Sequence, residues 1–294
     1  MDRISFYDQI SKNKRNSLLL AMIVSAVLFF LLYVIGDLFA PAYSFLIFLI
    51  SLIMVFLYSW STYFYGDKIV LKSVHAKPVD PNDPKYVHLI NVVEGLSIAA
   101  GIPTPKIYVM ESKEINAFAT GRDPKHASVC FTTGALENLN REEIEGVAAH
   151  EISHIKNYDI RFATVVAVMV GLAVIVSHVF LRSFRFGDRK RGSELLLIIG
   201  IILAIVAPVI TRIVQAAISR QREFLADASA VQLTRYPDGL ANALEKIKKI
   251  NQGKMNVNEA VSHLFFIDPN KSPLDRLFAT HPPIDERIKI LRSI

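Results

Sequence analysis

The sequence predicts an α+β membrane protein, in which four apolar helices accompany a mostly helical polar domain with a small β-sheet. Three observations predict this class. Hydrophobic residues make up 52% of the 294 residues and charged residues only 20%. The mean hydropathy of +0.34 indicates more apolar surface than a soluble core needs. Four long stretches carry almost no charge, and the polar remainder shows helical and strand-like hydrophobic patterns.

The four apolar stretches are candidate transmembrane or membrane-inserted helices. They lie at Asn16–Gly36, Leu38–Gly66, Phe162–Leu181 and Leu195–Thr211. About 20 apolar helical residues cross a bilayer, so the first three are long enough, while the fourth also needs residues 213–218. The apolar core of the first stretch is longer than that of a signal peptide, which favours a retained anchor.

The stretches divide the chain into four parts. We expect an N-terminal membrane anchor of two transmembrane helices at 1–66 and a membrane-inserted helical hairpin at 162–218. The two polar parts, 67–161 and 219–294, then form one domain.

The distribution of Lys and Arg predicts the orientation of the chain. The N-terminal arm is basic, the loop between the first two stretches carries only Asp37, and Lys68, Lys72 and Lys77 follow the second stretch. We therefore expect a multi-pass protein of the plasma membrane whose polar domain faces the cytoplasm. The basic loop at 182–191 disagrees with this rule, unless its flanking stretches enter the membrane without crossing it.

The formal net charge of +6 does not predict nucleic-acid binding, because membrane proteins collect Lys and Arg at helix ends. The expected partner is the lipid bilayer. Cys130 is the single cysteine, which excludes an internal disulfide, and its apolar surroundings predict a small buried residue.

Hydrophobic spacing predicts the elements of the polar domain. Helices are expected at His88–Gly101, from Asn140 to about residue 155, at Glu223–Thr234 and at Gly239–Ile250; strands are expected at Lys106–Met110, Ile115–Thr120 and Ala127–Thr132. Gly101 suits a helix C-cap, and Asn140 with Glu143 fits a capping box.

Residues 150–154 read His-Glu-Ile-Ser-His, and they carry the chemistry. On a helix His150 and His154 share one face, so that both imidazoles can bind one cation with Glu151 beside it. Zinc suits two histidines and a carboxylate, with its fourth position left to water. We therefore expect one Zn²⁺ per chain at this helix. The alternative is a pair of solvated histidines on a helix face.

The third ligand is expected to be Glu223. Glu223 and Asp227 are four residues apart and share a helix face. One carboxylate can bind the metal while the other holds the N–H of a metal-bound histidine. The alternative is a surface pair that balances Arg220 and Arg222.

Together these motifs closely resemble those of the HtpX membrane metalloproteases, which are relatives of the CAAX prenyl protease. The resemblance rests on residues 150–154 followed by Asn157 and Asp159, on the Glu223–Asp227 motif, on Asn-Ala-Phe-Ala-Thr-Gly at 116–121 and on Thr-His-Pro-Pro at 280–283. It covers nearly the whole chain, and it implies a metalloprotease domain of the zincin type.

The resemblance implies roles for individual residues. His150, His154 and Glu223 are implied zinc ligands, and Glu151 is the implied general base. Further implied roles are substrate binding by an edge strand at Asn116 and Ala117, oxyanion stabilisation by His281, support of His150 by Asp227 and support of Glu223 by Arg287. Asn157 and Asp159 are expected to fix the end of the zinc helix.

The expected activity is a zinc-dependent endopeptidase of membrane proteins. His154 lies 162 − 154 = 8 residues before the third apolar stretch, which predicts a site close to the cytoplasmic membrane face. The resemblance implies polypeptide substrates and a stress-response role in quality control of misfolded or damaged membrane proteins. The alternatives are a prenyl-protein protease, a non-catalytic scaffold, and a transporter that uses His178 of the third stretch.

Overall fold

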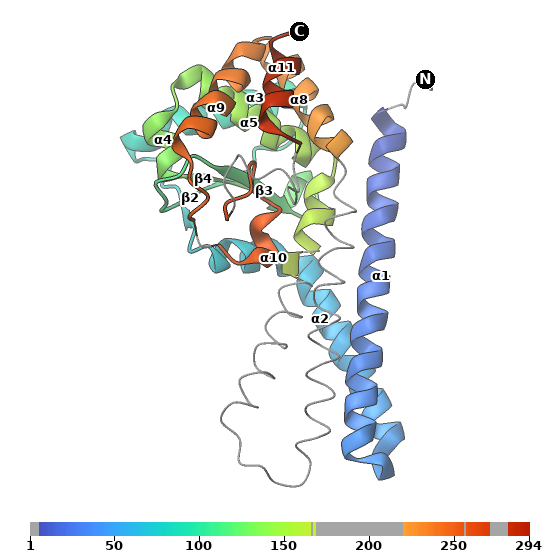
Figure 1. Cartoon of the computed structure of the whole chain (residues 1–294). Helices are drawn as coiled ribbons and strands as arrows, with labels where there is room; N and C mark the ends of the chain where they lie inside the picture. The colour runs from blue at the N-terminus through green and yellow to red at the C-terminus, as the bar shows by residue number, and fades with distance from the viewer. Residues whose placement is uncertain (1–5, 166, 169–219, 256, 271–281) are drawn as a thin grey trace.

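The computed structural model describes residues 6–165, 167–168, 220–255, 257–270 and 282–294. Two long helices, α1 (Phe6–Phe39) and α2 (Ser44–Ser73), form a hairpin that extends from a domain of helices and a small sheet (Figure 1). The third and fourth apolar stretches fall almost wholly outside the described residues, so the expectation of four apolar helices stays a prediction.

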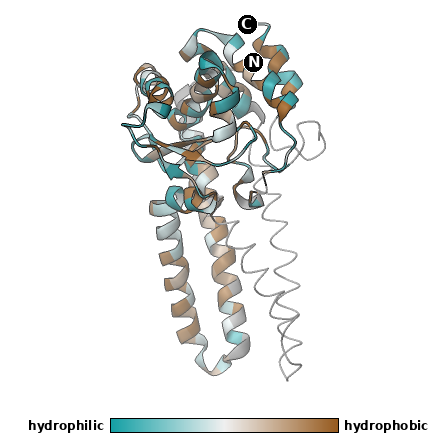
Figure 2. Ribbon diagram, turned by 90° about the vertical axis from the view of Figure 1, so that its left-hand side faces the viewer, coloured by the Kyte–Doolittle hydropathy of each residue, from teal (hydrophilic) through white to brown (hydrophobic). Residues whose placement is uncertain are grey.

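The chain from Pro41 through the end of α2 is long and apolar enough to cross a membrane, and among the described helices it alone meets both criteria. A shorter apolar run, Ala21–Val34, lies within α1. Figure 2 shows apolar residues along the hairpin. Large side chains such as Phe45, Phe56 and Trp60 are 53–76% exposed. A contiguous surface of this kind is stable in lipid and not in water.

The sheet is mixed and has the strand order β1-β2-β4-β3. β1 (Lys77–Pro78) runs antiparallel to β2 (Lys106–Met110), β2 runs parallel to β4 (Ala127–Thr132), and β4 runs antiparallel to β3 (Ala117–Gly121). β3 is therefore an edge strand. It begins two residues later than predicted, because the Asn251 side chain takes both backbone groups of Ile115, at 2.9 Å from its N–H and 2.8 Å from its C=O.

Helices cover the sheet and enclose the core (Figure 1). They are α3 (Val87–Ala100), α4 (Thr133–Asn138), α5 (Arg141–Lys156), α8 (Arg220–Thr234), α9 (Pro237–Ile250), α10 (Glu259–Ser262) and α11 (Ile284–Leu291), with short 3-10 turns at Pro41–Tyr43, Pro84–Tyr86 and Pro124–His126. The predicted helices, strands β2 and β4, the capping box at Asn140 and the C-cap at Gly101 (φ 69°) are confirmed. Cys130 is buried as predicted, and burial raises the pKa of its thiol.

α5 lies at the centre of the core and packs against α3, α8, α9 and β3. Its residues Val147, Ala149 and Ile152 are at most 1% exposed. The capping box holds the first turn of α5, and the apolar contacts on its sides then fix the direction in which residues 150–154 face.

A second apolar cluster joins the domain to α2. Val70 and Leu71 of α2, with Val74 just after it, pack with Phe118 of β3 and with Val168. Residues 159–165 are helical after a turn at Tyr158, whose φ is 61°. The Thr164 hydroxyl accepts a hydrogen bond from Gly121 N–H at 3.0 Å, and the Tyr58 hydroxyl donates to Val168 C=O at 2.8 Å. The chain that leaves α5 thus contacts both the sheet and α2.

We predict that Gly146→Ala destabilises the fold by roughly 1–3 kcal/mol, because an added Cβ would lie 2.6 Å from the backbone nitrogen of Leu240 on α9. Gly95→Ala is the matched control, since Gly95 is helical on α3 and has nothing within 4 Å of the added Cβ. We expect Gly95→Ala to stabilise the fold by about 0.5–1 kcal/mol. Thermal unfolding in detergent measures both, and equal effects would contradict the close α5–α9 contact.

Candidate metal centre and active site

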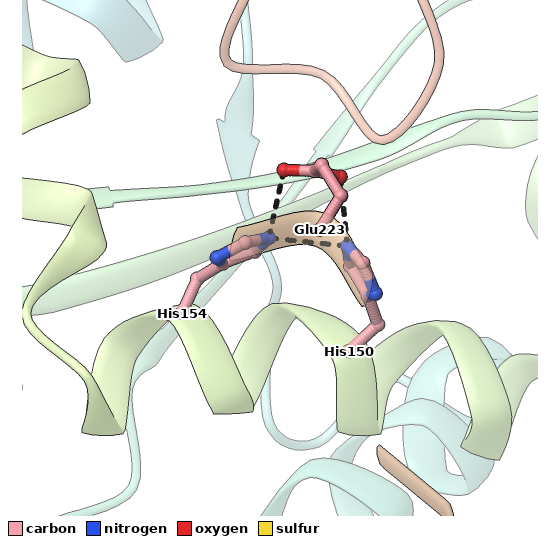
Figure 3. A group of neighbouring side chains, drawn as sticks. All are labelled: His150, His154 and Glu223. Atoms are coloured by element: carbon pink, nitrogen blue, oxygen red, sulfur yellow. Dashed lines mark hydrogen bonds and ion pairs between the residues drawn. The ribbon is translucent and has the colours of Figure 1, made fainter. Parts of the chain in front are cut away.

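His150, His154 and Glu223 converge at one point between α5 and α8. The two Nε2 atoms lie 3.1 Å apart, and the two Glu223 carboxylate oxygens lie 3.6 Å from His150 Nε2 and His154 Nε2. Figure 3 shows the carboxylate facing both imidazoles. One ligand atom from each of the three residues fits within 4.8 Å of the others. The helical spacing predicted that His150 and His154 lie together on α5, and the fold places Glu223 of α8 beside them.

The tautomers of both histidines follow from their other ring nitrogens. His150 Nδ1 lies 2.8 Å from Asp227 Oδ1, and His154 Nδ1 lies 3.1 Å from Asp159 Oδ2. A carboxylate only accepts hydrogen bonds, so each Nδ1 carries the proton and each Nε2 presents a lone pair. Two lone pairs at 3.1 Å repel unless a cation or a proton lies between them. Tetrahedral zinc, bound at about 2.0–2.1 Å, would hold two nitrogens about 3.3 Å apart, so the donor set fits this metal.

Arg287 of α11 supports the site through Asp227. Its Nε and Nη2 donate to the two Asp227 oxygens at 2.8 and 2.7 Å, and its side chain is fully buried. The resemblance implied support of Glu223 by Arg287. The ion pair of Arg287 is with Asp227, and the negative charge of Glu223 acts on the same guanidinium, because it helps to raise the pKa of Arg287. The implied contact of Asp227 with His150 is present.

Asp159 belongs to the site, although the sequence predicted only a structural role for it. It was expected to fix the end of α5, together with Asn157, which is indeed the C-cap residue. The turn at Tyr158 instead directs the Asp159 carboxylate to His154 Nδ1, and Arg222 lies behind it at 3.8 Å. The signal available in the sequence was the general need of a metal-binding histidine for a carboxylate at its second nitrogen.

Charges around the histidines shift two pKa values. Burial lowers the pKa of His154, but the hydrogen bond to Asp159 and the negative charges of Glu223, Asp159 and Glu151 outweigh it and raise this pKa to about 9. Burial raises the pKa of Asp227, but the charge of Arg287 and the hydrogen bonds from His150 and Arg287 lower it below its usual value. The surrounding carboxylates therefore strongly favour the binding of one positive charge at this site.

Glu151 and the metal-binding residues line a small cleft. Ala119 of β3, Phe162, His263 and Phe265 are also in its wall. The volume of the cleft is about 50 Å³, which is room for one or two water molecules. Glu151 is 2% exposed, so its carboxylate lies in a setting with little bulk water.

The outer edge of β3 is engaged by a segment of the chain itself, residues 264–267. Phe265 forms an antiparallel bridge with Phe118, and the Phe266 N–H donates to Ala117 C=O at 2.8 Å. The Asn116 side chain donates to Ile267 C=O at 2.8 Å and accepts from its N–H at 3.2 Å. Asn116 and Ala117, the expected substrate-binding pair, thus bind this segment here, and Ala119 is the β3 residue in the cleft wall.

Two further histidines concern the edges of the site. His281 lies outside the described residues, so its expected role stays a prediction. His263, which the sequence patterns did not single out, lines the cleft, and its Nε2 lies 3.1 Å from Ala163 C=O.

Comparisons with known proteins agree with this geometry. The family model "Peptidase family M48" matches residues 85–294, which is more than two thirds of the chain. The chain belongs to peptidase family M48. The matched residues include every metal-centre residue described above, from β3 to α11.

Curated M48 relatives share nearly the full length. "Protease HtpX homolog" of Dictyoglomus thermophilum is 47% identical over 100% of this chain and 96% of its own. The protein of the same name from Streptococcus thermophilus (strain CNRZ 1066) is 40% identical over 98% of this chain and 99% of its own. The resemblance to HtpX proteases is therefore confirmed, and it supports a membrane metallopeptidase.

A solved structure shares the fold. The crystal structure of S. mikatae Ste24p has a TM-score of 0.50 and 21% identity, and covers 96% of this chain. This chain spans 66% of that protein's length.

We predict that Asp159→Asn weakens zinc binding about 10- to 100-fold without unfolding the chain, because His154 loses the carboxylate that orients it. Chelator competition measures the affinity. Asp285→Asn on the exposed face of α11 is the matched control and should bind zinc like the wild type. Unchanged affinity of Asp159→Asn would contradict the assigned role.

We also predict that zinc affinity rises with pH. The pKa of His154 is raised to about 9 without metal, so below that pH zinc must displace a proton from Nε2. The apparent affinity should rise about tenfold per pH unit from pH 6 and level off near pH 9. Titrations against a pH-insensitive chelator test this, and an affinity that is constant from pH 6 to 9 would contradict it. Asp159→Asn should level off at lower pH.

Proposed function

We propose that the chain is a membrane-bound, zinc-dependent metalloendopeptidase. The observation that carries the proposal is the convergence of His150, His154 and Glu223, with both histidine Nδ1 atoms held by carboxylates. These three residues would hold one Zn²⁺. When bound there, zinc acidifies a water molecule to a pKa of about 7 and polarises the scissile carbonyl.

Glu151 supplies the proton transfer. Its carboxylate lines the cleft beside both histidines, so it takes a proton from the attacking water and later donates it to the leaving amine. The scarcity of bulk water strengthens these electrostatic interactions. His281 is proposed to stabilise the oxyanion, as the family resemblance implies.

An extended substrate is proposed to pair with the edge of β3, since free N–H and C=O groups of an edge strand accept any peptide backbone. Ala119, in the cleft wall, is the strand residue nearest to this chemistry. Pairing at Asn116 and Ala117, the positions that the resemblance implies, also requires displacement of segment 264–267.

Membrane proteins are the proposed substrates, in quality control of misfolded or damaged chains. The support is the packing of α2 and Val168 against the domain that carries the cleft. The proposal includes the plasma membrane as location, a cytoplasmic catalytic domain, and the division at 1–66, 67–161, 162–218 and 219–294.

We predict that Glu151→Gln keeps its zinc but that its peptidase activity falls about 10²–10⁴-fold, because the substitution removes only the group that accepts the proton. Glu145→Gln, on the same helix α5 but partly exposed, is the matched control and should keep full activity. Cleavage of casein and of a reconstituted misfolded membrane protein, with the zinc content of each variant, measures the effect.

The possible results separate the parts of the proposal. Bound zinc with no cleavage by wild-type protein would contradict peptidase function, and absence of zinc would contradict the ligand set. Cleavage of casein without cleavage of the membrane protein would support peptidase activity but contradict membrane proteins as the substrate class.

A further inference from the structure

A second cavity lies where α2 meets the sheet, away from the metal-binding residues. Its volume is about 390 Å³, and its wall includes Phe64, Tyr65 and Lys68 of α2 with Lys106 and Lys125 of the domain. Lys106 begins β2, and Lys125 lies in the turn before β4. The cavity therefore combines aromatic side chains from the helix with cations from two different elements.

The three lysines at this cavity outnumber the one carboxylate in its wall, that of Asp67. Lys68, Lys106 and Lys125 are exposed, and among the described residues no salt bridge or side-chain hydrogen bond joins any of them to a carboxylate. Two acids are near. Asp123 is occupied by His126 and by the backbone of its own turn, at 2.8–3.0 Å, and Asp67 is in the cavity wall.

Arginines extend the positive charge along the same face. Arg122 is in the cavity wall and stacks on Phe64, with 4.7 Å from its guanidinium carbon to the ring centroid, and it pairs with Asp123 at 3.5 Å. A neighbouring cavity shares Lys125 and is also lined by Lys156 and Arg161. Arg161 donates to Arg122 C=O at 2.6 Å, which joins the two cavities into one basic face.

The depth of this face relative to a bilayer follows from the length of α2. A hydrocarbon core of about 30 Å is crossed by roughly 20 helical residues, which reach from Pro41 to Trp60. Tyr63, Phe64 and Tyr65 follow, and such aromatic residues favour the membrane–water interface. Lys68 then lies one turn further from the lipid, at the level of the headgroups.

We propose that this cavity binds the phosphate headgroup of an anionic phospholipid. The lysines face the phosphate, while Phe64 and Tyr65 contact the glycerol region. The exposed apolar side chains below them, such as Phe56, Leu57 and Trp60, provide a continuous surface for the acyl chains. A soluble phosphate compound would use the lysines but not this apolar surface, which favours a lipid. The proposal rests on the proposed membrane placement of α2 and is independent of peptidase activity.

Trp60 makes the site directly measurable, because it is the single tryptophan of the chain and its ring lies 4.5 Å from that of Phe64. The full-length protein is reconstituted in phosphatidylcholine vesicles with brominated phosphatidylglycerol or brominated phosphatidylcholine at equal mole fraction. Bromine quenches tryptophan fluorescence on contact. We expect phosphatidylglycerol to be preferred beside Trp60 by about fivefold or more, since one lysine near a charged surface contributes about that factor, and high salt should weaken the preference.

Lys106→Glu/Lys125→Glu tests the domain side of the cavity and leaves the sequence of α2 unchanged. We expect it to remove the preference, so that both brominated lipids quench equally. Lys249→Glu/Lys289→Glu is the matched control, because both lysines are exposed on α9 and α11, which lie at the opposite end of the domain from the end that α2 joins (Figure 1). It changes the net charge equally and should keep the wild-type preference. Lys106→Ala/Lys125→Ala should give a smaller loss.

The other outcomes overturn the proposal in distinguishable ways. Equal quenching of the wild type by both lipids would leave α2 in the membrane but remove the lipid site. Absence of quenching by either lipid would contradict the membrane placement itself. Loss of the preference on adding inorganic phosphate at constant ionic strength would assign the cavity to a soluble phosphate.

Discussion

Two imidazole lone pairs held 3.1 Å apart are the constraint on which the rest of this structure depends. The pair is stable only if positive charge lies between the nitrogens, and the surrounding groups increase that demand. Glu223 faces both nitrogens, and two further carboxylates hold the opposite side of each ring. The pKa of His154 is raised to about 9 for the same reason, because without a metal a proton supplies the positive charge.

Meeting this constraint commits residues that are far apart in the chain. Asp227 is 2% exposed and is neutralised by Arg287, which is fully buried. Removing such a pair from water is costly, so it persists only when its hydrogen bonds are complete. Arg287 completes them with two bonds to Asp227 and a contact with Phe266 C=O at 3.5 Å. These contacts connect the C-terminal helix α11 to the metal centre. The metal centre therefore depends on residues from both polar parts of the chain.

The sequence predicted the parts of the site whose geometry is local. The capping box at Asn140 and the spacing of His150 and His154 are properties of one helix, and Glu223 and Asp227 share one face of another. Asp159 could not be assigned in this way, because its direction depends on the turn at Tyr158 with φ 61°. The sequence also left open whether Arg287 pairs with Glu223 or with Asp227, which lie one turn apart, because only the position of α11 in the fold decides between them. Pairing of segment 264–267 with β3 joins residues about 150 positions apart, and no local pattern announces such a contact.

Segment 264–267 links access to the cleft with the integrity of the metal centre. Phe265 closes one side of the cleft and packs on Phe118, with ring centroids 4.8 Å apart. The next residue, Phe266, packs its ring 4.8 Å from His150 and lies beneath the Arg287 guanidinium. Because the segment pairs with the outer edge of β3, a substrate that pairs with Asn116 and Ala117 must displace it. Because the same segment packs against His150 and Arg287, its displacement by a substrate would remove contacts that support the metal centre.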